Sequence, residues 1–136
     1  MKFFFDNNLP PALARGMAEL SKREADVEQV IHLRERFPGD EKDAAWIEAL
    51  RADGGPWYLI SIDKFKKDHR AERSAISSAG HTVYVLDPQW ASQNYWAKAA
   101  RLVLWWPNII DHARLSSGGV YRVPWRHTSQ SRFLAM

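Results

Sequence analysis

The sequence contains no cysteine, which excludes both a disulfide framework and a thiolate metal site. Long apolar stretches are also missing. The runs at residues 3–5 and 102–106 fall far short of the roughly 20 residues that a membrane-spanning helix needs. The first of them is also too short for the apolar segment of a secretory signal. We therefore expect a cytoplasmic protein without a membrane anchor.

Several common catalytic and ligand-binding patterns are absent as well. The sequence has no glycine-rich phosphate loop and no Ser-His-Asp signature, and no pair of histidines has the HxxxH or HxH spacing of a zinc site. His32 and His81 fall in predicted strands, where we expect them to be packed. The function must therefore come from other residue types.

The 136 residues are enough for one domain with its own hydrophobic core, and charge is distributed unevenly along them. Residues 1–63 contain 8 basic and 12 acidic side chains, a net charge of −4, whereas residues 64–136 carry +7. An acidic first half can supply metal ligands while a basic second half meets phosphates. Both halves being simply solvated surface is the alternative interpretation.

Hydrophobic patterns predict alternating strands and helices. We expect strands at residues 2–5, 27–33, 57–62, 81–86 and 120–124, and helices at residues 11–21, 42–50, 68–79 and 92–113, the last split in two by Pro107. This alternation predicts an α/β fold with three α/β/α layers and a mainly parallel central sheet. Residues 1–115 would form the domain, and residues 116–136 a C-terminal tail with a short strand packed on it.

Three aspartates stand where such a fold would bring them together. Asp6 and Asp63 each follow a strand, and Asp43 lies in the first turn of the helix that precedes the second of these strands. Ligands collect at the carboxyl ends of parallel strands, and Mg²⁺ and Mn²⁺ prefer carboxylate oxygens. The pattern favours a metal site for phosphodiester hydrolysis. Each residue alone could also be a local helix cap or turn residue.

The same segments resemble a known family. FFFDNNLPPALARGMAEL looks like the opening of PIN-like domains, DAAWIEAL resembles their later helix that begins with an acid, and WYLISIDKF resembles their strand with a terminal Asp. The likeness covers about residues 1–90 and is greatest to the compact, toxin-type (VapC-like) branch. It implies a PIN-like fold and a ribonuclease that uses Mg²⁺ or Mn²⁺, with Asp6, Asp43 and Asp63 as catalytic metal ligands. It also implies a cognate antitoxin as partner.

Other residues are candidates for supporting roles. The larger family has a second acid, usually a Glu on an early helix, for which Glu19 and Glu24 are the available candidates. Asn7, Asn8 and Glu72 could support the acidic site. The residues that we expect to contact RNA phosphates follow Asp63 and are Lys64, Lys66, Lys67 and Arg70, with His69 and Arg73 nearby. The alternative interpretation of this basic segment is a solvated helix face.

Two other functions remain open. A catalytically degraded PIN-like module could bind RNA or a protein without cleaving it, and the missing second acid keeps this alternative in place. A receiver-like phosphoacceptor domain also gathers acids at strand ends, but Asp6-Asn7-Asn8 lacks its paired acids. The tryptophans Trp90, Trp96, Trp105 and Trp106 could form a homodimer or partner surface, although burial is the simpler interpretation.

Overall fold

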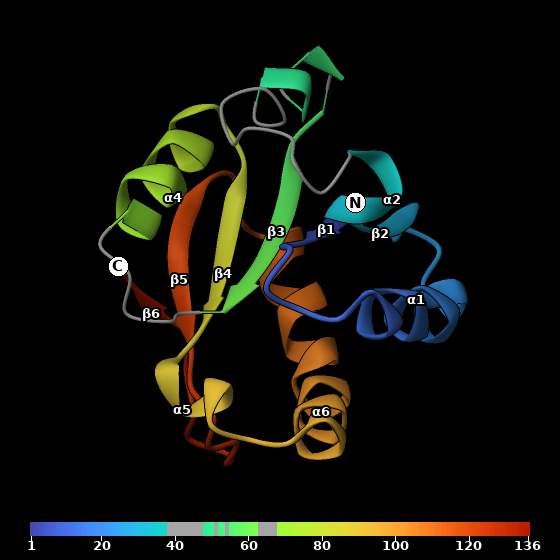
Figure 1. Ribbon diagram of the computed structural model, residues 1–136, viewed down its shortest axis with the longest axis vertical. Helices are drawn as coiled ribbons and strands as arrows, with labels where there is room; N and C mark the ends of the chain where they lie inside the picture. The colour runs from blue at the N-terminus through green and yellow to red at the C-terminus, as the bar shows by residue number, and fades with distance from the viewer. Residues whose placement is uncertain (38–47, 51, 54, 63–67) are drawn as a thin grey trace.

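The computed structural model describes residues 1–37, 48–50, 52–53, 55–62 and 68–136, and of residues 68–72 only the backbone. Its sheet has six strands: β1 (Lys2–Phe5), β2 (Gln29–His32), β3 (Trp57–Ile62), β4 (Thr82–Leu86), β5 (Gly119–Val123) and β6 (Leu134–Ala135). The α-helices are α1 (Pro11–Leu20), α2 (Leu33–Arg36), α4 (Asp68–Ser78), α5 (Pro88–Ala91) and α6 (Tyr95–Arg114). Residues 48–50 are helical too (Figure 1).

The strands are arranged in the order β2-β1-β3-β4-β5-β6. The first five are parallel, and only β6 runs antiparallel to its neighbour. The register pairs Phe5 with Ile60, so the residue after β1 is next to Ser61 of β3. All five parallel strands therefore present their carboxyl ends at one edge of the sheet, which we call the carboxyl edge.

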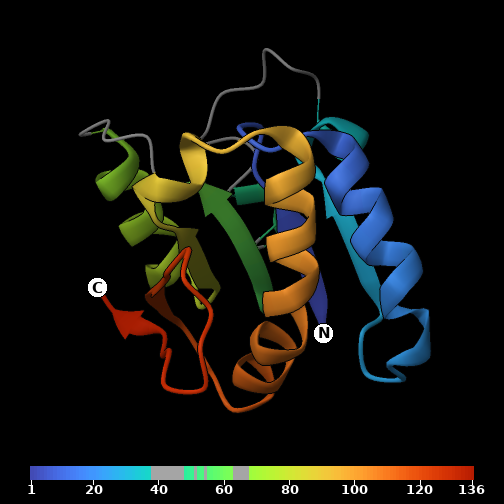
Figure 2. The same ribbon diagram turned by 90° about the horizontal axis from the view of Figure 1, so that it is seen from below.

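Side-chain alternation along the strands gives the sheet two apolar faces. Phe3, Phe5 and Ile60 belong to one buried cluster, which also contains side chains of α1 and α6. Phe4 and Leu59 belong to the other cluster, together with Ile76 of α4. Figure 2 shows α1 and α6 on the same face of the sheet. The predicted three-layer α/β/α architecture is confirmed.

Most elements agree with the expectations, but α6 does not. It runs without interruption through Pro107, so the predicted split into two helices is wrong. Proline removes one backbone hydrogen bond and normally breaks or kinks a helix. Here Trp105 and Trp106 before the proline, and Ile109 and Ile110 after it, are all buried in the same core. Burial of both halves against one sheet face outweighs the local preference of proline.

The tryptophans divide into two groups. Trp90, Trp105 and Trp106 are buried, as the simpler interpretation expected, whereas Trp96 is 78% exposed. Trp96 is the second residue of α6, where the helix extends beyond the core. None of the helices in the described part of the chain is both long enough and apolar enough to cross a membrane.

Candidate functional site at the carboxyl edge

Asp6 lies at the carboxyl edge with its backbone fixed on both sides. Its N–H donates to the carbonyl of Ile60 at 2.9 Å, which extends the β1–β3 pairing by one residue. Its carbonyl accepts from the N–H of Leu9 at 3.0 Å, closing a tight turn into α1. The side chain is half-buried. The carboxyl group is therefore held in place at the point where the chain leaves the sheet.

Both oxygens of this carboxylate have a donor. The Ser61 hydroxyl donates to Oδ2 at 2.9 Å, and the backbone N–H of Asn7 donates to Oδ1 at 2.5 Å. A carboxylate offers about four lone-pair sites, so one bond to each oxygen leaves capacity for a cation. Hard oxygen donors of this kind suit Mg²⁺ and Mn²⁺. The group can act as a metal ligand without breaking either hydrogen bond.

Ser61 is a residue that the sequence interpretation missed. It is only 4% exposed and is the one serine inside the apolar strand WYLISI. A buried hydroxyl needs a partner, and its position two residues before Asp63 was the available signal. It ties the acid on β1 to the strand that leads into Asp63.

The strand order adds a topological reason for a site here. From β1 the chain goes first to β2 on one side of it and later to β3 on the other, so the order reverses between β1 and β3. In open α/β sheets, ligands bind in the crevice outside the carboxyl ends of the strands at this switch point. Asp6 and Ser61 lie on the two strands that form it.

Asn7 and Arg34 form a polar pair beside Asp6. The side-chain oxygen of Asn7 accepts from Arg34 Nε at 2.7 Å, and this places an exposed guanidinium next to the acidic edge. Asn8 is half-buried and makes no hydrogen bond with another described side chain. Of the two asparagines, Asn7 thus binds a cationic side chain.

His32 is a structural brace rather than a ligand. It is fully buried, its Nδ1 accepts from the backbone N–H of Arg34 at 3.0 Å, and its Nε2 lies 2.6 Å from the carbonyl oxygen of Leu9. This requires the neutral ring with the proton on Nε2. Both nitrogens are used, and the expectation that His32 is packed is confirmed.

A second aspartate at the same edge has a different role. Asp87 follows β4 and caps α5: its Oδ1 accepts from the N–H of Gln89 at 3.0 Å and its Oδ2 from the N–H of Trp125 at 3.1 Å. These bonds connect the end of β4 to the segment after β5. Asp87 therefore serves structure, and it provides a matched acid against which Asp6 can be compared.

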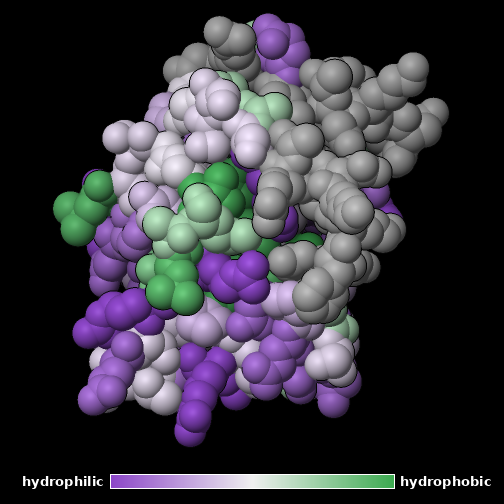
Figure 3. Space-filling model, turned by 90° about the vertical axis from the view of Figure 1, so that its left-hand side faces the viewer, coloured by the Kyte–Doolittle hydropathy of each residue, from purple (hydrophilic) through white to green (hydrophobic). Residues whose placement is uncertain are grey.

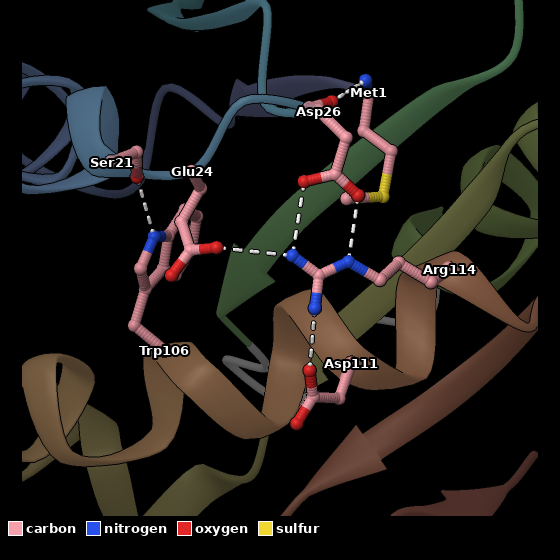
Figure 4. A network of polar contacts seen from close by, with 7 residues as sticks. All are labelled: Met1, Ser21, Glu24, Asp26, Trp106, Asp111 and Arg114. Carbon is pink, nitrogen blue, oxygen red and sulfur yellow. Dashed lines mark hydrogen bonds and ion pairs between the residues drawn. The ribbon is translucent and has the colours of Figure 1, made fainter.

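The two candidates for the family's second acid lie away from this site. Glu19 is in the last turn of α1, about 12 Å along the helix from its start, and pairs with Lys22. Glu24 Oε2 accepts from Arg114 Nη2 at 3.1 Å (Figure 4). The same guanidinium also contacts Asp26 and Asp111. The carbonyl of Asp26 accepts from the amino terminus of Met1, at the opposite edge of the sheet. Neither glutamate substitutes for the missing acid.

The remaining predicted site residues fall where the structure gives no side chain. Asp43, Asp63, Lys64, Lys66 and Lys67 lie outside the described residues. Arg70 and Glu72 are described only as backbone of α4. Within the described ranges, no group of three or more His, Asp or Glu side chains could hold a metal ion.

Arg73 differs from the expectation for the basic segment. It is 8% exposed, and its Nη1 has no hydrogen-bond partner in the described part of the chain. It therefore belongs neither to a solvated helix face nor to a set of accessible phosphate contacts. A buried guanidinium requires a counter-charge or acceptors, and the described residues do not supply one for this nitrogen.

Taken together, the fold and the site define a class: a three-layer α/β protein with an oriented, half-buried carboxylate at the topological switch point. A family model described as PIN like domain matches residues 1–88, and the chain belongs to this family. PIN-like domains are generally nucleases and typically use divalent metals. No curated protein and no solved structure matches this chain.

Proposed function

We propose that the chain is a metal-dependent ribonuclease that hydrolyses phosphodiester bonds of RNA. The supporting observation is the Asp6 carboxylate, which is oriented by Ser61 and Asn7 and has lone pairs left for a cation. In this proposal Asp43 and Asp63 complete the ligand set for Mg²⁺ or Mn²⁺. Asp63 directly follows Ile62, the last residue of the strand that pairs beside Asp6.

In the proposed reaction the cation and the protein side chains have different roles. When bound, such a cation lowers the pKa of a water molecule and offsets charge that develops on the phosphate oxygens. Asp6 holds its position through the Ser61 hydroxyl, and Arg34 adds a positive charge at the same edge. Lys64, Lys66, Lys67 and Arg70 would contact the RNA phosphates. A toxin role, with an antitoxin that covers the acidic edge, is part of the same proposal.

A cleavage assay with matched acids tests this function. A labelled RNA is incubated with Mn²⁺ and wild type, Asp6→Asn or Asp87→Asn protein. We expect Asp6→Asn to lower the cleavage rate at least about 100-fold, because a metal ligand is lost. Asp87→Asn removes the same charge at the same edge and keeps a good helix cap, so its rate should remain close to wild type.

A catalytically degraded binding module is the second candidate, since both glutamates available as the second acid are engaged elsewhere. Thermal melting of both variants is the control for folding, and each should melt cooperatively, as the wild type does. If the wild type binds RNA but never cleaves it with Mn²⁺ or Mg²⁺, the binding module is correct and the nuclease is refuted. Equal cleavage by Asp6→Asn and wild type would also refute the proposed site.

A further inference from the structure

The solvent-facing side of α6 is apolar over its first three turns. Trp96, Ala100, Val103 and Pro107 follow one another at intervals of four, three and four residues, which places them in one stripe along the helix. Leu104 borders this stripe, and all five residues are exposed. We call these five residues the α6 face. Contiguous exposed apolar residues of this kind commonly mark a contact surface.

The charged residues of α6 lie outside this face. At 3.6 residues per turn, Lys98 and Arg101 are about 200° and 140° around the helix from Trp96. Both are half-buried, and the guanidinium of Arg101 lies 4.2 Å from the ring centroid of Trp125. The α6 face therefore offers no basic side chain to the phosphates of a nucleic acid. Its chemistry fits an apolar protein surface.

A groove between α6 and the end of α1 adjoins the α6 face. Figure 2 shows these two helices side by side on one face of the sheet. The groove has a volume of about 160 Å³, and its lining includes Leu20 and Ile110 together with Val103 and Pro107 of the α6 face. An apolar cavity of about 150 Å³ can hold a benzene ring. The groove thus has room for the six-membered ring of an indole.

The groove also contains a hydrogen-bond acceptor. Glu24 belongs to its lining, and Oε2 of this residue accepts from Arg114 at 3.1 Å (Figure 4). The other carboxylate oxygen, Oε1, accepts no hydrogen bond from the described residues. An indole N–H usually finds a partner when the ring is buried. Apolar walls with one free carboxylate oxygen are therefore complementary to a tryptophan side chain, in polarity as well as in size.

The exposed indole and the groove lie on the same side of one helix, as a two-fold dimer requires. In such a dimer, residue i of one copy contacts residue j of the other, and j contacts i. The midpoint of the segment from Trp96 to Pro107 falls between residues 101 and 102. If two α6 helices pack antiparallel about this midpoint, each Trp96 lies opposite Pro107 of the other copy, beside the groove. Ala100 then lies near the two-fold axis, where its small side chain permits close approach of the helices.

The electrostatics and the area of this contact are compatible with association. Because the α6 face has no charged side chain, the two-fold axis brings no like charges of this face together. A buried tryptophan covers about 150–250 Å², so two copies of Trp96 at 78% exposure would supply roughly 240–400 Å². Leu20, Val103 and Leu104 are 44–54% exposed and add apolar area from both copies. An interface of about 1,000 Å² in total is within reach, which is enough for a specific dimer.

We propose that the α6 face is the interface of a two-fold dimer of this chain. Trp96 of each copy occupies the groove of the other copy, and Glu24 accepts a hydrogen bond from its indole N–H. The proposal goes beyond the proposed function and does not depend on it. The side of the molecule that carries α4 and β6 takes no part in this contact (Figure 3).

Sedimentation velocity over about 1–100 µM protein tests the dimer, a range that brackets the affinity of a small interface. We expect the wild type to associate with rising concentration. Trp96→Ala should weaken association at least about 100-fold, because each dimer loses two central aromatic contacts. Ala100→Glu should abolish association, since it buries two like charges near the axis. Leu134→Ala is the matched control: it truncates a side chain of β6 that is 60% exposed, and it should associate like wild type.

Chemical crosslinking gives a second readout that depends on the position of the axis. The chain has no cysteine, so a short bismaleimide can join a single Ala100→Cys variant only to another copy. We expect a crosslinked dimer for Ala100→Cys and none for Leu134→Cys.

Several results would overturn the proposal. A wild type that stays monomeric over the whole concentration range would do so. A dimer that is insensitive to Trp96→Ala and Ala100→Glu would place the interface elsewhere, and equal losses in Trp96→Ala and Leu134→Ala would remove its link to the α6 face. Trp96-dependent binding of RNA or of another protein by a monomeric wild type would assign the face to that partner instead.

Discussion

Removing the Ser61 hydroxyl should weaken the proposed metal site while leaving the fold intact. In Ser61→Ala, Oδ2 of Asp6 loses a donor at 2.9 Å, and of the two bonds to this carboxyl group from described residues only the one from Asn7 remains. A hydrogen bond to a charged group contributes about 1.5–3 kcal/mol. Because Asp6 is half-buried, water replaces part of this bond, so we use the lower limit.

About 1.5 kcal/mol corresponds to roughly a tenfold change in an equilibrium or rate constant. Ser61→Ala should therefore weaken Mn²⁺ binding and slow RNA cleavage about tenfold each. This agrees with the effect expected when a residue that orients a metal ligand is removed, about 10- to 100-fold.

Ser21→Ala is the matched control for a lost buried hydroxyl. Ser21 is 3% exposed, follows the C-terminal end of α1 and accepts from Trp106 Nε1 at 2.8 Å (Figure 4). Its removal leaves a buried indole N–H without a partner and should lower the free energy of unfolding by about 1–3 kcal/mol. Urea denaturation and cleavage kinetics are measured for both variants. Unchanged Mn²⁺ affinity in Ser61→Ala, or equal loss of cleavage in Ser21→Ala, would refute the reasoning.

Three further predictions concern stability and charge. Burial lowers the pKa of His81 and His112 below the usual 6.5, so the unfolded state binds more protons below about pH 7. Urea titrations should therefore show the free energy of unfolding falling as the pH decreases from 7 to 5.5, and a constant value would contradict this. Pro107→Ala should raise the free energy of unfolding by up to about 3 kcal/mol, and with it the melting temperature, without changing cleavage. A lower melting temperature would be inconsistent with the account. The hydrogen bond from Arg114 holds the pKa of the Asp26 carboxyl below its usual range, so Arg114→Met should raise this pKa in an NMR titration, whereas an unchanged value would rule out the contact.

The strands could be predicted from the sequence because their side chains pack into apolar clusters on both faces of the sheet. The apolar residues of β1 and β3 alternate between the two faces, and a segment apolar on both sides has few other places in a small α/β domain. The short helices α2 and α5 were not predicted, because four residues are too few to show a helical period. The continuity of α6 through Pro107 depends on tertiary packing, and local helix propensity does not predict such packing.

The candidate site could be predicted only in part, for a similar reason. The sequence places Asp6 after a strand, and local patterns suffice for that. The role of Ser61 depends on the β1–β3 register, which joins residues 55 positions apart. The engagement of Glu24 depends on Arg114, 90 positions away. Trp96 resembles the core tryptophans in the sequence and differs from them only in the position at which α6 leaves the core.

Calorimetric titration with Mn²⁺ tests the central claim most directly, because it measures the metal site without requiring a known RNA target. Wild type, Asp6→Asn, Asp63→Asn and Asp87→Asn proteins are compared under identical conditions. We predict binding heat for wild type and Asp87→Asn, and at least tenfold weaker binding for Asp6→Asn and Asp63→Asn. Equal heats for all four proteins would contradict a cation site built on Asp6 and Asp63.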